Sequence, residues 1–212
     1  MDYTTLQKLL FEKAEKNIDN HDPSHDIQHC IRVLKNCERI VEKEWWDMEI
    51  LLPAALFHDI INYPKDDPRA QYASNESAVW TMKLLEKIQE YPTSKIQKVW
   101  YAITHCSYSK NLPHETIESQ ILQDADFLES VWAIAVMRTF CTSGTLWRQF
   151  FSESDLFCEH REPEPLKYCF DLFAQRLLKV QDRMLTTTGK ELAKQRTEFL
   201  HTFIDQVKKE VK

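Results

Sequence analysis

The residues with the clearest chemical potential are an ionisable pair, His58 and Asp59, near the end of an otherwise apolar segment, LLPAALFHDII. Burying such a pair without compensation costs several kcal/mol. A divalent cation would compensate both groups, because imidazole and carboxylate then serve as ligands. Adjacent residues lie about 100° apart around a helix. The pair can therefore bind one ion only where the helix end faces that ion or the backbone adjusts.

Two other segments carry donors of the same kinds. His25, Asp26 and His29 are spaced so that one helix would bring all three to one face. The histidines at i and i+4 match half of a zincin site, but the HExxH glutamate is not there. Asp124 and Asp126 lie in a third segment, where helical periodicity does not decide between them. Taken singly, each histidine is well explained as a buried core residue.

Helical periodicity surrounds these segments and predicts the elements that position them. We expect helices over residues 4–18, 23–45, 48–61, 74–88, 93–105, 116–139, 165–185 and 189–209, with Asp22 as the N-cap of the second. Residues 62–73, which contain two prolines, and the acidic segment 152–165 are predicted loops. Nothing repeats at a fixed period. We therefore predict an all-α, irregular bundle of about eight or nine helices in a single domain, residues 1–212.

Composition excludes several functional classes. The chain has two glycines, Gly144 and Gly189, whereas phosphate-binding loops of P-loop and dinucleotide-binding proteins need two or three closely spaced ones. Chemistry on phosphates must therefore use side chains and metal ions. The net charge of −6 argues against nucleic-acid or membrane partners. The six cysteines form no CxxC pair and the first residues have no leader pattern, so we expect reduced thiols and a cytoplasmic protein.

Four segments in this order resemble the motifs of HD-domain metal-dependent phosphohydrolases, in particular the bacterial branch that hydrolyses nucleotides. They are DPSHDIQHCIRVL, LLPAALFHDI, ITHCSYSK and ILQDADFLESVWAIAVMRTF. The resemblance implies an HD-domain fold for a core at about residues 20–140, followed by a helical extension at about 145–212. It also implies a metal-binding quartet: His29, His58, Asp59 and Asp126. His25 and Asp26 would orient these ligands, and Asp124 is the alternative ligand or another orienting group.

The resemblance also indicates, by position, residues that hold phosphate or position water. The candidates for phosphate contact are Lys65, Arg69 and Lys110. Glu76 is a candidate general base, although an acid near a helix start is also favoured by the helix dipole. His105 is a candidate for contact with the substrate or with a metal ligand. Asp59 would orient the attacking water. Lys65 and Arg69 are equally well explained as solvated side chains of a charged loop.

The chain departs from the family pattern at one segment. The family's DADRLDA becomes DADFLES here, so Phe127 replaces an arginine and removes a cation. Branches with two metals carry two further ligand histidines, for which His105 and His114 are the candidates. Pro113 suggests that His114 lies at a surface helix start, which favours one ion.

The expected function is hydrolysis of a phosphoester or phosphoanhydride bond in a small nucleotide by metal-activated water. Mixed nitrogen and oxygen ligands suit Mn²⁺, Fe²⁺, Co²⁺, Ni²⁺ or Mg²⁺. The alternatives are an HD-type oxygenase with two irons and a non-catalytic HD module that binds a nucleotide. The helices beyond residue 145 are candidates for capping the pocket or for forming a homodimer surface.

Overall fold

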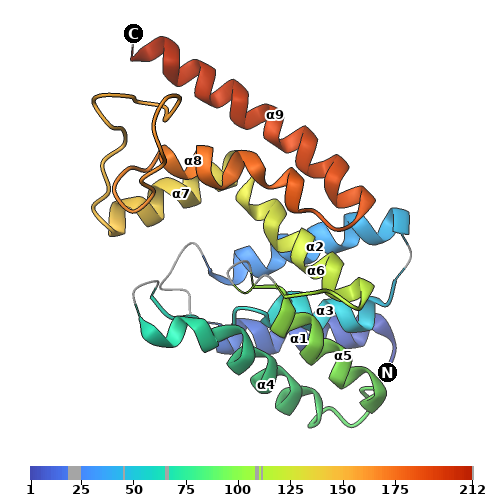
Figure 1. The fold of residues 1–212 in the computed structure, drawn as a ribbon. Helices are drawn as coiled ribbons and strands as arrows, with labels where there is room; N and C mark the ends of the chain where they lie inside the picture. The colour runs from blue at the N-terminus through green and yellow to red at the C-terminus, as the bar shows by residue number, and fades with distance from the viewer. Residues whose placement is uncertain (19–24, 45, 65–66, 108–109, 111, 212) are drawn as a thin grey trace. The chain divides into compact units, whose positions relative to one another are not determined.

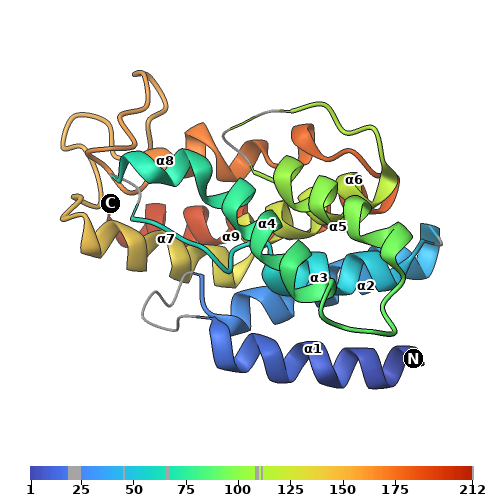
Figure 2. The same cartoon turned by 90° about the horizontal axis from the view of Figure 1, so that it is seen from below.

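The structure, a computed structural model, describes all residues except 19–24, 45, 65–66, 108–109, 111 and 212. Over these described residues the regular structure is helical, with nine α-helices, four short 3-10 helices and no strand (Figures 1 and 2). The predicted all-α class is therefore confirmed. None of the described helices combines the length and apolarity needed to cross a bilayer.

The chain divides into two compact units, which meet in sequence between Asp126 and Phe127. The sequence placed the end of the core near residue 140 instead, and the single-domain organisation stays a prediction. The helices that begin in the N-terminal unit are α1 (Tyr3–Asn17), α2 (Ile27–Glu44), α3 (Met48–Phe57), η1 (Pro68–Tyr72), α4 (Ala73–Leu85), α5 (Thr93–His105) and α6 (Ile117–Phe127).

Helix α3 is the centre of the N-terminal unit. Every residue from Ile50 to Phe57 is buried, as the apolar run in the sequence requires. The helix packs against α1, α2, α4 and α5, so a polar group placed at its end lies among several other elements. Helices α4 and α5 also run side by side (Figure 1).

The C-terminal unit contains η2 (Leu128–Ser130), α7 (Ala133–Thr145), α8 (Asp171–Gln175), η3 (Leu177–Lys179), η4 (Gln181–Arg183) and α9 (Thr187–Glu210). A cluster of phenylalanine rings surrounds the buried Phe170 and Phe173 of this unit. Its contacting centroids lie 4.6 to 6.5 Å apart, and the other members are Phe140, Phe150, Phe151, Phe157 and Phe203. Such aromatic pairs add stability beyond the area that they bury.

Several predicted helices match the structure and three do not. The helices at 4–18, 93–105 and 189–209 are confirmed within two residues at each end. The predicted helix 116–139 is interrupted at Trp132, whose positive φ of 91° no helix accommodates. The predicted helix 165–185 is wrong as one continuous helix, because the range holds only the short α8, η3 and η4. Before α8, Cys169 and Phe170 donate their backbone N–H groups to the carbonyls of residues 149 and 150. The predicted helix 48–61 ends four residues early.

Candidate metal centre

His29 enters the site from the first turn of α2, where its side chain is fully buried. The predicted start of this helix, Asp22 and Pro23, lies outside the described residues. His25 and Asp26, predicted to be helical, precede α2 instead. The Asp26 carboxylate accepts a hydrogen bond from the His29 backbone N–H at 2.9 Å, as an N-cap does. Asp26 thus fixes the backbone from which the His29 imidazole projects.

His58 and Asp59 lie just beyond the last residue of α3. The Nδ1 atom of His58 lies 2.9 Å from the Ala55 carbonyl oxygen. A carbonyl can only accept, so Nδ1 carries the proton and Nε2 presents a lone pair. That Nε2 is buried without a hydrogen-bond partner among the described residues. A buried imidazole nitrogen of this kind is poised to bind a cation.

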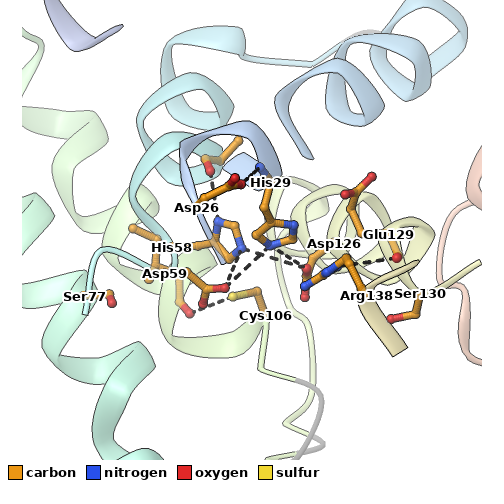
Figure 3. A network of polar contacts seen from close by, with 12 residues as sticks. Asp26, His29, His58, Asp59, Ser77, Cys106, Asp126, Glu129, Ser130 and Arg138 are labelled. Carbon is orange, nitrogen blue, oxygen red and sulfur yellow. Dashed lines mark hydrogen bonds and ion pairs between the residues drawn. The ribbon is translucent and has the colours of Figure 1, made fainter. Parts of the chain in front are cut away.

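The imidazoles and carboxylates of four residues converge (Figure 3). His29 Nε2 lies 3.6 Å from Asp59 Oδ2 and 3.4 Å from Asp126 Oδ1, and His58 Nε2 lies 3.4 and 3.9 Å from the same two oxygens. Ligand atoms of His29, His58 and Asp126 all lie within 4.8 Å of one another. The break after α3 is what allows adjacent residues 58 and 59 to face one point.

Asp126 reaches the site from the last turn of α6. The sequence left Asp124 and Asp126 as alternatives, and the structure directs the Asp126 carboxylate at both imidazoles. Beside it, the Asn36 side chain of α2 donates to the Ala125 carbonyl at 3.0 Å. This bond fixes the end of α6 against α2, the helix that carries His29.

The electrostatics keep both carboxylates negatively charged. Burial by itself raises the pKa of Asp59 and Asp126, but the neighbouring imidazoles of His58 and His29 outweigh that effect and hold each pKa below its usual value. Two carboxylates and two imidazoles in one place are the ligand set of a divalent cation.

The nearby thiols do not change the ligand set. Cys30 and Cys106 are both buried in the same unit. Burial raises the pKa of each thiol well above its ordinary value, and the Asp59 and Asp126 carboxylates raise it further. Since only thiolates bind metals well, the donors remain nitrogen and oxygen. This set fits Mn²⁺, Fe²⁺, Co²⁺, Ni²⁺ or Mg²⁺.

Two charged candidates near the start of α4 have partners from the loop before it. Glu76 accepts a hydrogen bond from the Tyr63 hydroxyl at 2.6 Å. Arg69 forms a two-pronged ion pair with Asp67, and its guanidinium lies 4.5 Å from the centre of the Tyr63 ring. Arg69 is nevertheless 63% exposed, so it remains open to a ligand. The third candidate, Lys65, lies outside the described residues.

Lys110 lies at the N-terminus of α4 and not in open solvent. Its ammonium group donates to the Ser74 hydroxyl at 2.6 Å and to the Asn75 side-chain oxygen. Burial lowers the pKa of this lysine, because its charged form loses hydration. Both contacts are to neutral oxygens, which leaves the positive charge available to an anion.

His105 is the last residue of α5 and is oriented by its own helix. Its Nδ1 lies 2.8 Å from the Tyr101 carbonyl oxygen, and its ring stacks on Tyr101 with centroids 3.8 Å apart. Because the carbonyl accepts the Nδ1 proton, Nε2 carries the lone pair. The side chain is half-buried, so this nitrogen can meet a ligand.

His114 is not at a surface helix start, contrary to the sequence expectation. Helix α6 begins three residues later, at Ile117, and His114 is half-buried. Its Nδ1 lies 3.1 Å from the Ser119 hydroxyl and its Nε2 lies 2.7 Å from the Gln123 side-chain oxygen. Burial lowers the pKa of His114, because desolvation disfavours the imidazolium.

We expect His114 to make stability depend on pH. Its pKa is lower in the folded than in the unfolded chain, so below about pH 6.5 the unfolded chain binds the extra proton. The free energy of unfolding should therefore fall as the pH falls from about 7 to about 5. This fall should be smaller for His114→Gln than for wild type. Urea unfolding at both pH values measures this difference. His201→Gln, at an exposed position of α9, is the control, and equal losses for His114→Gln and wild type would contradict the prediction.

Some residues of the site gave no signal in the sequence. Asn36, Tyr63 and Ser77 are common polar residues on ordinary helical or loop segments. Their importance depends on contacts with backbone or side chains far away in sequence, such as the Asn36 bond to residue 125. Periodicity reports which face a residue occupies and does not report such partners.

The chain and its fold are similar to those of known proteins. The chain is 26% identical to YpgQ, an uncharacterised protein of Bacillus subtilis, over 98% of this chain and 91% of YpgQ. The structure of YpgQ in complex with ADP has a TM-score of 0.72 at 24% identity, with 97% of each chain covered. An HD-superfamily hydrolase from Bacillus thuringiensis has a TM-score of 0.66 at 24% identity, covering 98% of this chain and 95% of that one.

The family model described as the HD domain matches residues 26–130. That range contains the four converging side chains, with His29 near its start and Asp126 near its end. The structural neighbours share the fold over almost the whole chain. The chain therefore contains an HD domain, at residues 26–130.

Proposed function

We propose that this protein hydrolyses a phosphoester or phosphoanhydride bond of a small nucleotide, with one divalent metal ion as cofactor. The observation that carries the proposal is the convergence of two imidazoles and two anionic carboxylates around the buried Nε2 of His58. The relative YpgQ has been crystallised with ADP, which supports a nucleotide as the substrate class.

His29, His58, Asp59 and Asp126 would hold the metal ion. When bound, such an ion lowers the pKa of a water molecule towards about 7 and polarises a phosphoryl oxygen. The Asp59 side chain is 31% exposed, more than any other member of the quartet, so it can also meet solvent. Because its lowered pKa keeps it anionic, Asp59 can accept a hydrogen bond from water and orient the water for attack.

Cationic groups of the chain would hold the phosphate. Lys110 offers an ammonium group at the N-terminus of α4, where the helix dipole also favours an anion. Arg69 offers an exposed guanidinium on η1, the 3-10 helix before α4, and Lys65 is proposed for the same role. These side chains replace the glycine-rich loop that the sequence lacks.

Two further residues are proposed to act on protons. His105 presents Nε2 as an acceptor, since its Nδ1 is committed to the Tyr101 carbonyl. Glu76 is a candidate general base whose carboxylate is oriented by the Tyr63 hydroxyl. The contacts of His114 with Ser119 and Gln123 occupy both of its ring nitrogens, which supports one metal ion over two.

Metal removal should abolish the activity and its return should restore it. Protein treated with a chelator and then dialysed should release neither phosphate nor pyrophosphate from a panel of nucleoside di- and triphosphates. Adding Mn²⁺ back should restore release. A metal at 100 times its Kd should also stabilise the folded chain by about 2.7 kcal/mol, seen as a higher Tm.

Metal analysis of the purified protein, combined with the nucleotide screen, tests the proposal. One equivalent of a divalent metal with release of phosphate or pyrophosphate is the expected result. If the protein binds a metal but hydrolyses no nucleotide of the panel, it is instead a non-catalytic module that binds a nucleotide. The cytoplasmic location, a homodimer and the absence of nucleic-acid or membrane partners stay predictions.

A further inference from the structure

The segment that carries His58 and Asp59 needs support from outside its own helix. Helix α3 ends at Phe57, so the two residues lie in a turn whose backbone is not held by a helical ladder. One bond within this turn is the Ile60 N–H to the Phe57 carbonyl, at 3.2 Å. His58 is anchored by its own Nδ1, whereas Asp59 is oriented through its backbone and its contacts with imidazoles.

Ser77 provides support for this turn from α4. Its hydroxyl accepts a hydrogen bond from the Ile61 N–H at 3.1 Å and lies 3.3 Å from the Ile61 carbonyl oxygen, to which it donates. A hydroxyl is among the few side-chain groups that can do both at once. Ser77 is fully buried and Ile61 is half-buried, which limits competition from water for these bonds. One side chain thus satisfies both backbone polar groups of the residue two positions after Asp59 (Figure 3 shows Ser77 beside the site).

We propose that Ser77 is a positioning residue for Asp59, and that it sets the metal affinity of the site by fixing the turn through Ile61. This inference rests on the proposed metal-dependent function. Ser77 acts through the backbone and contacts neither the metal nor the substrate. Supporting residues of this kind typically change metal affinity about 10- to 100-fold when they are removed.

Thr81 offers a matched control on the same helix. It is also fully buried, and its hydroxyl donates at 2.8 Å to the Ser77 backbone carbonyl within α4. Thr81→Val removes one buried hydroxyl and its hydrogen bond without touching the turn after α3. Ser77→Ala and Thr81→Val should therefore both lower stability, and a general loss of packing in α4 would affect them alike.

The test is Mn²⁺ binding to metal-free protein, measured by isothermal titration calorimetry. We expect Ser77→Ala to raise the Kd for Mn²⁺ about 10-fold or more and Thr81→Val to leave it within about twofold. Ser77→Cys replaces the hydroxyl with a slightly larger thiol, which is a weaker donor and acceptor, so it should shift the Kd in the same direction if the alanine variant does not fold.

The outcomes separate this inference from the proposed function. If wild type and Ser77→Ala bind Mn²⁺ equally, or if Thr81→Val weakens binding as much as Ser77→Ala, Ser77 has no positioning role. A wild type that binds Mn²⁺ without hydrolysing nucleotides would overturn the hydrolase function alone. A wild type that binds no divalent ion would overturn both.

Discussion

Asp59→Ala should abolish nucleotide hydrolysis while leaving the fold nearly intact. The residue contributes a carboxylate that contacts both imidazoles, and it is the candidate acceptor for the attacking water. Removing a residue that only supports a metal ligand typically lowers metal affinity or activity about 10- to 100-fold. Loss of a ligand itself should therefore lower kcat/KM by more than about 100-fold. Release of phosphate and pyrophosphate under saturating Mn²⁺ is the measurement, with Tm of the metal-free protein as the check on folding.

Glu49→Ala is the matched control for this experiment. Glu49 lies at the other end of the same helix, α3, and its side chain is 32% exposed against 31% for Asp59. It pairs with Lys95 and not with the imidazoles. We expect this variant to keep wild-type turnover. Full turnover by Asp59→Ala would contradict the metal-hydrolase proposal. An equal loss of turnover in both variants would indicate damage to α3.

The class of the fold and the position of the site could be predicted because they depend on local pattern. Apolar residues at helical spacing give the all-α class, and buried helices such as α3 follow from a long apolar run. The pair His58 and Asp59 stood out because an uncompensated buried charge is too costly to be accidental. The resemblance to a known family then joined His29 and Asp126 to that pair, and the structure brings these four side chains together.

What the sequence could not predict depends on tertiary contacts. Asp124 and Asp126 both fit an apolar stripe of the same helix, so periodicity could not choose between them. The resemblance pointed to Asp126, and its contacts with His29 and His58 appear only in the folded structure. The early end of α3 had no glycine or proline to signal it. The turn after α3 is instead hydrogen-bonded, through Ile61, to Ser77, which lies sixteen residues after Ile61 in the chain. Local propensity carries no information about such a partner.

The acidic loop at 152–165 shows the same limit in the C-terminal unit. It was predicted as a loop from its prolines and charges, but charge alone did not predict that it is anchored. Asp171, the first residue of α8, is fully buried and accepts bonds from both Arg161 terminal nitrogens, at 2.5 and 2.6 Å, and from the Glu164 N–H at 2.7 Å. The Arg161 guanidinium also donates to the carbonyls of residues 155 and 162.

Asp171→Ala should therefore clearly destabilise the C-terminal unit. It removes the carboxylate that three donors share and leaves a guanidinium without its counter-charge. Breaking a fully buried pair costs about 3–5 kcal/mol, but Arg161 is 18% exposed and can partly reach water, so we expect about 2–3 kcal/mol. The guanidinium chloride concentration at the midpoint of unfolding, followed by far-ultraviolet circular dichroism, should be lower than in wild type.

Glu159→Ala is the contrasting variant, because it breaks an ion pair that the same loop makes at the surface. Glu159 and Lys208 are 52% and 31% exposed, and water replaces their mutual contact at little cost. The unfolding midpoint should therefore move far less than in Asp171→Ala. Equal shifts in the two variants would mean that the buried carboxylate does not anchor the loop.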